Sequence, residues 1–286
     1  MLYIRCKHKY MTWLRSIVLT AGMLGLVLNG PGLASAGVHP GHPAPDQGKP
    51  SLAIIIDDLG NGMKGTEQVL SLPAPISVAV MPFLPTTKTD AERAHSLGHD
   101  VLVHLPMEPN KGKKEWLGPG AITSGMTDEE VRQAVLNAIA DVPHAVGVNN
   151  HMGSKITSDR RIMSVVLDVC REQGLFFVDS RTNFRSVAAQ LAKEKGMPPV
   201  GNDIFLDDQY NLTHISKQMR SVEDRLKQGQ DCVTIGHVGV PGLYTASVLK
   251  SSLPRLQGQV RLLGISDFVR NVWGWDPHAV QPTDKR

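Results

Sequence analysis

Aromatic residues are scarce in this 286-residue chain, at 5% of the sequence. Proteins that bind single-stranded nucleic acid use aromatic side chains as stacking platforms inside basic grooves, and this sequence offers little material for either. The formal net charge is only +3, and acidic and basic residues are interspersed downstream of the N-terminus. No basic stripe or long acidic tail stands out, so we expect no nucleic-acid partner.

Cysteine is also rare, with three residues in the chain. Cys6 lies in the N-terminal segment, which leaves Cys170 and Cys232 for the folded domain. Cys170 falls on an amphipathic helical pattern and Cys232 opens a hydrophobic strand. Two cysteines in an exported domain could form a disulfide, but this placement favours two separate thiols in the core.

The most apolar run, Ile17 to Leu28, has about a dozen residues and is short for a transmembrane helix. Basic residues precede it, and Ala34-Ser35-Ala36 follows with the small-x-small pattern that signal peptidase accepts. We therefore predict a signal peptide over residues 1–36, cleaved after Ala36, and a periplasmic or secreted protein. Alternatively the segment stays uncleaved, and would then be the protein's membrane contact.

Downstream, composition separates a linker, one domain and a tail. Residues 37–50 are rich in proline and glycine, residues 51–272 alternate apolar runs with helical segments, and residues 273–286 are polar. With 41% hydrophobic residues the chain can bury a full core. Most apolar runs are short and unbroken, as in strands buried on both faces of a parallel sheet. We expect strands at 52–56, 76–80, 101–104, 145–149, 175–178, 203–206, 232–235 and 260–263.

Helical patterns fill the gaps between these strands. Thr127 and Glu130 form a capping box ahead of one helix. Ser158 can cap another helix, which Gly174 would end. Strand–helix alternation without a break in composition predicts an α/β fold, a distorted (β/α) barrel of about seven to eight parallel strands.

Ionisable and polar side chains follow nearly every predicted strand. In (β/α) barrels the reactive groups lie at the carboxyl ends of the strands. Single members have structural explanations, because acidic pairs cap helices and isolated histidines hydrogen-bond within cores. The number of ionisable and polar residues at one edge nevertheless favours a shared site. We assign Asp207 and Asp208, which also follow a predicted strand, mostly to structure. The candidates are Asp57, Asp58, His104, Glu108, Asn150, His151, Asp179, Ser180, Arg181 and His237.

The residue types in this set suit metal-assisted amide hydrolysis. Asp58, His104 and His151 offer the aspartate and two histidines of a common divalent-metal site, and their mixed oxygen and nitrogen donors favour zinc. A second carboxylate, Asp57, can act as general base on metal-bound water. His237 can protonate a leaving amine. Ser180 lacks the Gly-x-Ser-x-Gly context of a serine nucleophile.

Six segments in order resemble the divergent polysaccharide deacetylase family: AIIIDDLGNG, SVAVMPF, GHDVLVHLPMEP, VGVNNHMGSKITSD, FFVDSRT and NDIFLDD. These are exported bacterial proteins, distantly related to carbohydrate esterases that remove N-acetyl groups from chitin-like or peptidoglycan sugars. The resemblance covers about residues 52–272. It implies a distorted (β/α) barrel and a metal-dependent N-deacetylase acting on an acetylated cell-envelope glycan.

The resemblance also implies roles for particular residues. The strand-end pair becomes a base, Asp57, followed by a metal ligand, Asp58. His104 matches the first of two histidine ligands that stand four residues apart, and Glu108 occupies the place of the second. Either His151 replaces that missing ligand or Glu108 itself coordinates.

Two further positions follow from the same resemblance. His237 in TIGHVG is similar to the late histidine that protonates the leaving group. The family's arginine-bearing motif has no clear match, although Arg181 could occupy similar space. The histidine-to-glutamate departure motivates an alternative, a catalytically degenerate protein that binds glycan or an envelope protein without turnover. A further alternative is cleavage of a peptide amide at the same metal.

Overall fold

The computed structural model describes residues 48–276, so the predicted signal peptide, most of the linker and the end of the tail lie outside the described residues. The strands are β1 (Ser51–Leu59), β2 (Ser77–Val80), β3 (Asp100–Met107), β4 (Ala145–Met152), β5 (Phe176–Asp179), β6 (Val200–Gly201), β7 (Ile204–Phe205), β8 (Cys232–His237) and β9 (Arg261–Leu263). The α-helices are α1 (Thr66–Leu70), α2 (Thr87–Ser96), α3 (Asp128–Asp141), α4 (Arg160–Glu172), α5 (Ala188–Glu194), α6 (Leu212–Lys227), α7 (Gly242–Leu256) and α8 (Ile265–Trp273). Two 3₁₀ helices, η1 (Lys114–Trp116) and η2 (Ile156–Ser158), lie in connections after β3 and β4.

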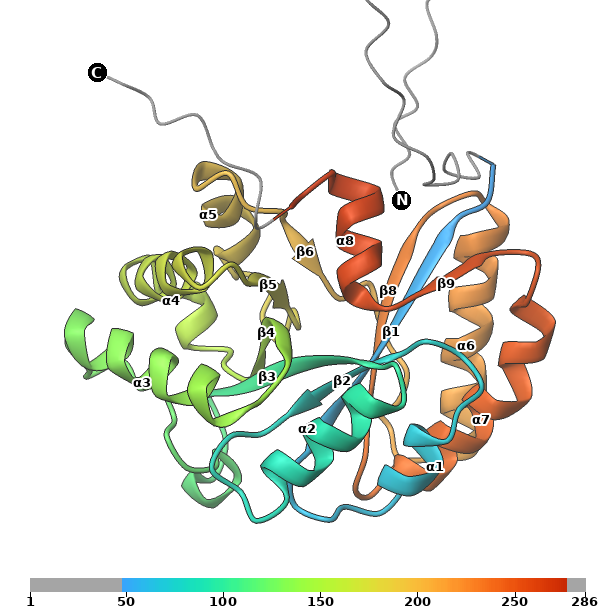
Figure 1. Ribbon diagram of the computed structural model, residues 1–286, viewed down its shortest axis with the longest axis horizontal. Helices are drawn as coiled ribbons and strands as arrows, with labels where there is room; N and C mark the ends of the chain where they lie inside the picture. The colour runs from blue at the N-terminus through green and yellow to red at the C-terminus, as the bar shows by residue number, and fades with distance from the viewer. Residues whose placement is uncertain (1–47, 277–286) are drawn as a thin grey trace, which may run out of the picture. The chain divides into compact units, whose positions relative to one another are not determined.

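One sheet contains all nine strands of residues 48–276, in the order β6-β5-β4-β3-β2-β1-β8-β7, with β9 paired to β1. Every strand pair is parallel. β6 and β7 form the two edges, so the curled sheet does not close (Figure 1). The predicted distorted (β/α) barrel is confirmed, and each predicted strand is present. The two-residue strand β6 was not predicted, because a pair of residues carries no hydrophobic period.

The strands separate two apolar layers. Leu52, Ile54 and Ile56 of β1 pack in the larger layer with residues of α1 to α7, while Ala53 and Ile55 pack in a smaller one. The smaller layer lines the interior and includes Ile265, Phe268 and Val269 of α8 (Figure 1). Since side chains alternate along a strand, the next interior positions lie at the carboxyl end of each strand. That end of the interior is where the polar residues begin.

Of the two helix N-caps predicted from the sequence, one is present and the other lies one residue later. The capping box of Thr127 and Glu130 is present at the start of α3. The assignment of Ser158 as a cap is wrong, because Ser158 belongs to η2 and Asp159 accepts the hydrogen bond from the backbone N–H of Ile162. An aspartate one residue later takes the same role with a stronger, charged acceptor.

The two cysteines of the domain are free and buried, as predicted. Burial raises the pKa of both Cys170 and Cys232 to about 12, so neither thiol is a nucleophile near neutral pH. Among the described residues, no helix is both long and apolar enough to cross a membrane.

Candidate metal centre

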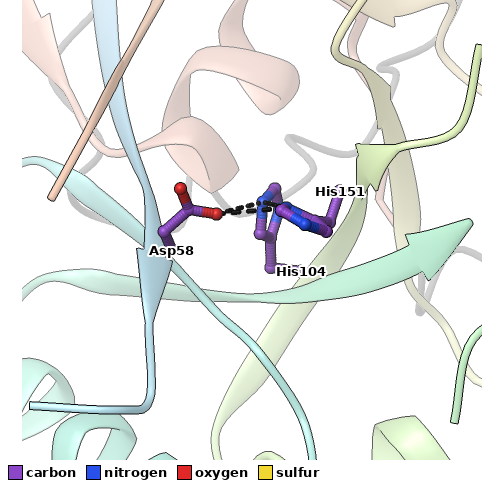
Figure 2. Close-up of side chains that lie close together, drawn as sticks. All are labelled: Asp58, His104 and His151. Atoms are coloured by element: carbon purple, nitrogen blue, oxygen red, sulfur yellow. Dashed lines mark hydrogen bonds and ion pairs between the residues drawn. The ribbon is translucent and has the colours of Figure 1, made fainter. Parts of the chain in front are cut away.

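The aspartate pair at the end of β1 lies in a β-bulge. The pairing with β2 shifts register between Ile56 and Leu59, so β1 contains one extra residue there. Asp57 faces the interior by the alternation of β1. Asp58 would face away in a regular strand, but its backbone has φ 71°, an uncommon value for a residue with a side chain. The bulge therefore brings both carboxylates to one side, and Figure 2 shows Asp58 pointing at two histidines.

His104 of β3 and His151 of β4 complete this group. His104 occupies an interior position of its strand, and Pro106 of β3 lies opposite His151 in the parallel ladder. Oδ1 of Asp58 lies 3.2 Å from Nε2 of His104 and 3.1 Å from Nδ1 of His151. Those two ring nitrogens are 3.1 Å apart. Three atoms with metal-binding chemistry therefore converge on one point (Figure 2).

The outer nitrogens of both rings already have acceptors. Nδ1 of His104 lies 2.8 Å from the side-chain oxygen of Asn149, and Nε2 of His151 lies 2.9 Å from the backbone carbonyl of Trp116. An oxygen that cannot donate requires the proton to sit on the ring nitrogen that faces it. The inner nitrogens then present lone pairs, as metal-ligating histidines do.

Asp58 supplies the third donor. Its Oδ1 is buried and has no hydrogen-bond partner among the described residues, and the two imidazole nitrogens lie 3.2 Å and 3.1 Å from it. Such an orphaned acceptor beside two lone pairs is costly without a cation. Asp58, His104 and His151 therefore fit a divalent metal, with positions left open for water and substrate.

Asp57 is buried next to this group but is held differently. Its Oδ1 accepts a hydrogen bond of 2.8 Å from Nδ2 of Asn149, and its Oδ2 lies 3.7 Å from Nε2 of His104. Burial raises the pKa of Asp57, whereas the imidazoles of His104 and His237 lower it to a smaller extent. Burial would also raise the pKa of Asp58, but His104 and His151 outweigh it and hold that pKa well below its usual value. The pair therefore has divergent acidities, as expected where two carboxylates have different tasks.

Asn149 joins the base candidate to a ligand candidate. Its amide accepts from His104 and donates to Asp57, and its side chain is fully buried. Burial alone would lower the pKa of His104, but Asp57 and Asp58 raise it. The sequence-based prediction omitted Asn149, although its position two residues before His151 places both on the same face of β4.

The carboxyl end of β8 contributes His237, which lies beside Asp57 in the β1–β8 ladder. Asp207 holds it twice, since Oδ1 lies 2.7 Å from Nδ1 of the ring and Oδ2 accepts 2.7 Å from the backbone N–H. Thr245 donates a further hydrogen bond of 2.6 Å to Oδ2 of Asp207. Burial would lower the pKa of His237, but Asp207 dominates and raises it to about 9. His237 is therefore a cation at neutral pH, able to give up a proton.

A cavity of about 360 Å³ lies between the two clusters. Asp58, Asp207 and His237 line it together with Phe205 and Tyr210. The cavity connects one candidate metal ligand, Asp58, with the candidate proton donor, His237, an arrangement that suits a hydrolytic site. Asp207, which the sequence analysis assigned mostly to structure, thus belongs to the site as a positioning residue for His237.

Glu108 lies outside the converging group. Its carboxylate accepts 2.6 Å from Nζ of Lys155 and 2.7 Å from the backbone N–H of Ser124. The lysine and the Ser124 amide lower the pKa of Glu108 to about 2. This carboxylate ties the connection after β3 to the connection after β4, and the structure brings His151 rather than Glu108 to Asp58 and His104.

The remaining candidates connect β4 and β5. The side-chain oxygen of Asn150 accepts 2.9 Å from the backbone N–H of Ser180, and the Ser180 hydroxyl donates 2.9 Å to the carbonyl of Asn150. Asp179 is largely buried, which raises its pKa, and accepts from the backbone N–H of Arg181. The Arg181 guanidinium donates to the carbonyl of Asn202 and pairs with Asp203. Arg181 therefore ties the connection after β5 to the segment between β6 and β7.

A family comparison matches this architecture. Residues 54–269 match the model of the family described as divergent polysaccharide deacetylase. The chain belongs to this family. An uncharacterized protein of Haemophilus influenzae is 35% identical over 220 residues, covering 77% of each chain. The uncharacterized protein YibQ of Escherichia coli is 35% identical over 218 residues, 76% of this chain and 67% of that one.

A solved structure supports the fold of this chain. An uncharacterized protein of Agrobacterium tumefaciens superposes with a TM-score of 0.72 at 19% identity, covering 79% of this chain and 92% of the other. At that identity the similarity establishes the barrel and leaves the chemistry to the residues of the site.

Proposed function

We propose that this divergent deacetylase is an exported, zinc-dependent N-deacetylase of an acetylated cell-envelope glycan. One observation carries the proposal: the three-donor group of Asp58, His104 and His151 lies beside a buried carboxylate, Asp57, and Asp58 shares a cavity with a cationic histidine, His237. Family membership supports the reaction class, and the N-terminal sequence of residues 1–36 supports export. Polar, mixed nitrogen and oxygen donors support zinc.

Asp58, His104 and His151 would hold the metal, which when bound supplies an acidified water and a Lewis acid for the acetyl carbonyl. As general base, Asp57 would accept a proton from the attacking water, whose oxygen would add to the acetyl carbonyl carbon. Its burial favours this task, because a carboxylate with a raised pKa is a stronger base. Asn149 fixes the carboxylate by its hydrogen bond to Oδ1, leaving Oδ2 to receive the proton.

His237 completes the reaction from the other wall of the cavity. Its imidazolium donates a proton to the amide nitrogen as the C–N bond breaks. The products are acetate and a free amine on the sugar, so one water and one amide are consumed in each turnover. The carboxylate of Asp207 keeps His237 charged at neutral pH and fixes a proton on Nδ1, so that Nε2 holds the proton available for donation.

Acetate release from N-acetylglucosamine oligomers and from peptidoglycan tests the function. Purified protein loaded with zinc should release acetate, and chelation followed by zinc addition should abolish and then restore the release. Failure across a panel of acetylated glycans and divalent metals, with glycan binding intact, would instead support the degenerate binding protein that the position of Glu108 suggested. Release of amines from peptides alone would support the peptide-amide alternative.

A further inference from the structure

Exposed apolar side chains gather around the candidate site. Among the described residues, ten large hydrophobic side chains are exposed, and eight of them lie in connections that follow a strand or in the first turn of the next helix. A soluble surface has no need to concentrate such side chains at one end of a barrel. The eight are Phe83, Trp116, Phe184, Tyr210, Leu212, Val240, Leu243 and Tyr244.

Two of these aromatic side chains stand on neighbouring loops. Trp116 belongs to the connection after β3 and Phe184 to the connection after β5, and both rings are open to solvent, 60% and 93% exposed. Ser154 ties the two loops together, since its carbonyl accepts from the side-chain amides of Asn110 and Asn183. The backbone carbonyl of Trp116 also accepts from His151, which places the Trp116 end of these loops beside one candidate metal ligand.

A cationic side chain lies over each of the two rings. Nζ of Lys113 lies 5.6 Å from the centroid of the Trp116 ring, and the guanidinium carbon of Arg185 lies 5.3 Å from that of Phe184. Neither cation has a carboxylate partner among the ion pairs of the described residues, so both charges are available to a ligand. We call these four residues the aromatic–cation surface.

Charge is distributed unequally around the barrel mouth. The connections after β3, β4 and β5 (residues 108–127, 153–159 and 180–187) contain six cationic and three anionic residues, a net +3. The connections after β1, β7 and β8 (residues 60–65, 206–211 and 238–241) contain one cation and two anions, a net −1. A ligand that extends from the metal over the first group of loops meets exposed rings within positive potential.

We infer that the aromatic–cation surface binds an anionic glycan, with sugar rings packed on Trp116 and Phe184 and carboxylates paired with Lys113 and Arg185. The inference rests on the proposed function and narrows its substrate to acetylated glycans that carry acidic groups. Apolar sugar faces suit exposed aromatic rings, and carboxylates complement the uncompensated cations. A neutral chitin-like chain would use the rings and leave the two charges without partners.

Binding can be measured apart from turnover in the zinc-loaded, full-length Asp57→Asn variant. The probe is a tetrasaccharide of alternating N-acetylglucosamine and N-acetylmuramic acid, and the matched control is the same molecule with its carboxylates converted to amides. By calorimetry at low salt we expect the acidic form to bind about tenfold more tightly, with the difference lost as ionic strength increases. Lys113→Gln combined with Arg185→Gln should remove that preference. Lys217→Gln combined with Lys250→Gln, on helices α6 and α7, should retain it.

Ring truncation separates the two parts of the surface. Trp116→Ala and Phe184→Ala should each weaken both forms by about five- to tenfold, whereas Trp273→Ala on α8 should weaken neither. Equal affinity for the acidic and amidated forms would overturn the anionic-glycan inference and leave the deacetylase proposal intact. Tighter binding to anionic phospholipid vesicles than to either glycan would also overturn it. No binding of either glycan by wild type or variant would count against both.

Discussion

The barrel mouth contains two clusters of histidine and aspartate that differ in how their side chains are hydrogen-bonded. In the group of Asp58, His104 and His151, the outer ring nitrogens are hydrogen-bonded to groups outside the cluster, and Oδ1 of Asp58 faces the two inner nitrogens without a hydrogen-bond partner. In the pair of Asp207 and His237, the carboxylate uses both oxygens on the histidine and on Thr245. The first cluster therefore presents lone pairs to a ligand, whereas both carboxylate oxygens of the second cluster already accept hydrogen bonds.

This difference shows that residue type alone does not assign chemistry. Asp207 with His237 forms a closed charge pair that stabilises a proton, and raises the pKa of His237 to about 9. Asp58 with the imidazoles of His104 and His151 forms an open set that suits a metal. The hydrogen-bond partners outside each cluster, Asn149 and Trp116 for one and Thr245 for the other, decide which outcome is reached.

The largest effect should come from removing the carboxylate of the open cluster. Asp58→Ala should weaken zinc binding by about 100-fold or more, beyond the range typical of outer-shell residues, and reduce acetate release to background. Competition with a chromophoric chelator measures the affinity. The matched control is Asp208→Ala, an exposed aspartate on the other side of the mouth that pairs with His214, and it should bind zinc normally. Equal loss in both variants would erase the distinction between the two clusters.

Asp57→Asn separates proton transfer from metal binding. It keeps the shape of the side chain and removes the base, so kcat should fall by about 10²–10⁴-fold. Zinc affinity should change little, because Asp57 is not one of the three converging donors. Steady-state kinetics and zinc titration are run on the same preparation. A variant that releases acetate at the wild-type rate would remove Asp57 as the base.

Asn149→Ala tests whether the hydrogen-bond partner of His104 contributes to zinc affinity. Without the acceptor on Nδ1, His104 loses its fixed tautomer, and zinc affinity should fall by about 10–100-fold. Asn150→Ala is the control, since Asn150 is equally buried and hydrogen-bonds to Ser180 and Met152 instead. The d–d spectrum of the cobalt-substituted protein should change for Asn149→Ala alone. Identical behaviour of both variants would reduce Asn149 to a general structural role.

The closed cluster predicts a pH effect. The pKa of His237 is raised, so activity should persist up to about pH 9 and fall above it as the imidazolium deprotonates. Asp207→Asn removes the charge that raises this pKa, so the alkaline limb should move toward the ordinary histidine value of about 6.5. Thr245→Val removes a neutral hydrogen bond to the same carboxylate and should shift the limb much less.

The same pKa makes a prediction for stability. A histidine whose pKa is higher in the folded state contributes stability that is complete below its unfolded value and is lost as the pH passes through the folded value. For His237 that loss spans about pH 6.5 to 9. Denaturant titrations of the metal-free protein should show it in wild type and not in Asp207→Asn. An unchanged slope in the variant would assign the pH dependence to other groups.

The smallest effect should come from Glu108→Gln. The Glu108–Lys155 pair is partly exposed, so its loss should cost no more than about 1 kcal/mol of the free energy of unfolding. Zinc affinity should be unchanged, which urea titration and chelator competition together can check. A tenfold loss of zinc affinity would show that Glu108 coordinates, and would restore the ligand spacing that the family resemblance suggested.

The fold and the edge at which polar residues collect could be anticipated from the sequence. Parallel strands buried on both faces leave unbroken apolar runs, and the polar residues that end these runs share one edge of the sheet. That reasoning selected Asp58, His104, His151 and His237 as candidates, and the first three lie close together in the structure. The bulge that turns Asp58 inward leaves no such signal, because it depends on the register of β1 against β2. Sequence spacing alone also could not choose between His151 and Glu108, since the choice depends on how the loops after β3 and β4 pack.

The hydrogen-bond partners of the site histidines were harder to predict from the sequence. Asn149 could have been found from the two-residue period of β4, which places it on the face of His151. The contribution of Trp116 is a backbone carbonyl, which any residue could supply, so its identity carries no information. Asp207 meets His237 only because β7 pairs with β8 in the curled sheet, and the run of strand residues predicted at 203–206 did not identify that neighbour.

The central claim is that Asp58, His104 and His151 hold a divalent metal. A crystal of the zinc-loaded protein, measured at the zinc absorption edge, tests it most directly. We expect one strong anomalous peak about 2.0–2.2 Å from Oδ1 of Asp58, Nε2 of His104 and Nδ1 of His151. A peak on Glu108, a peak between Asp207 and His237, or no peak at the three donors would contradict it.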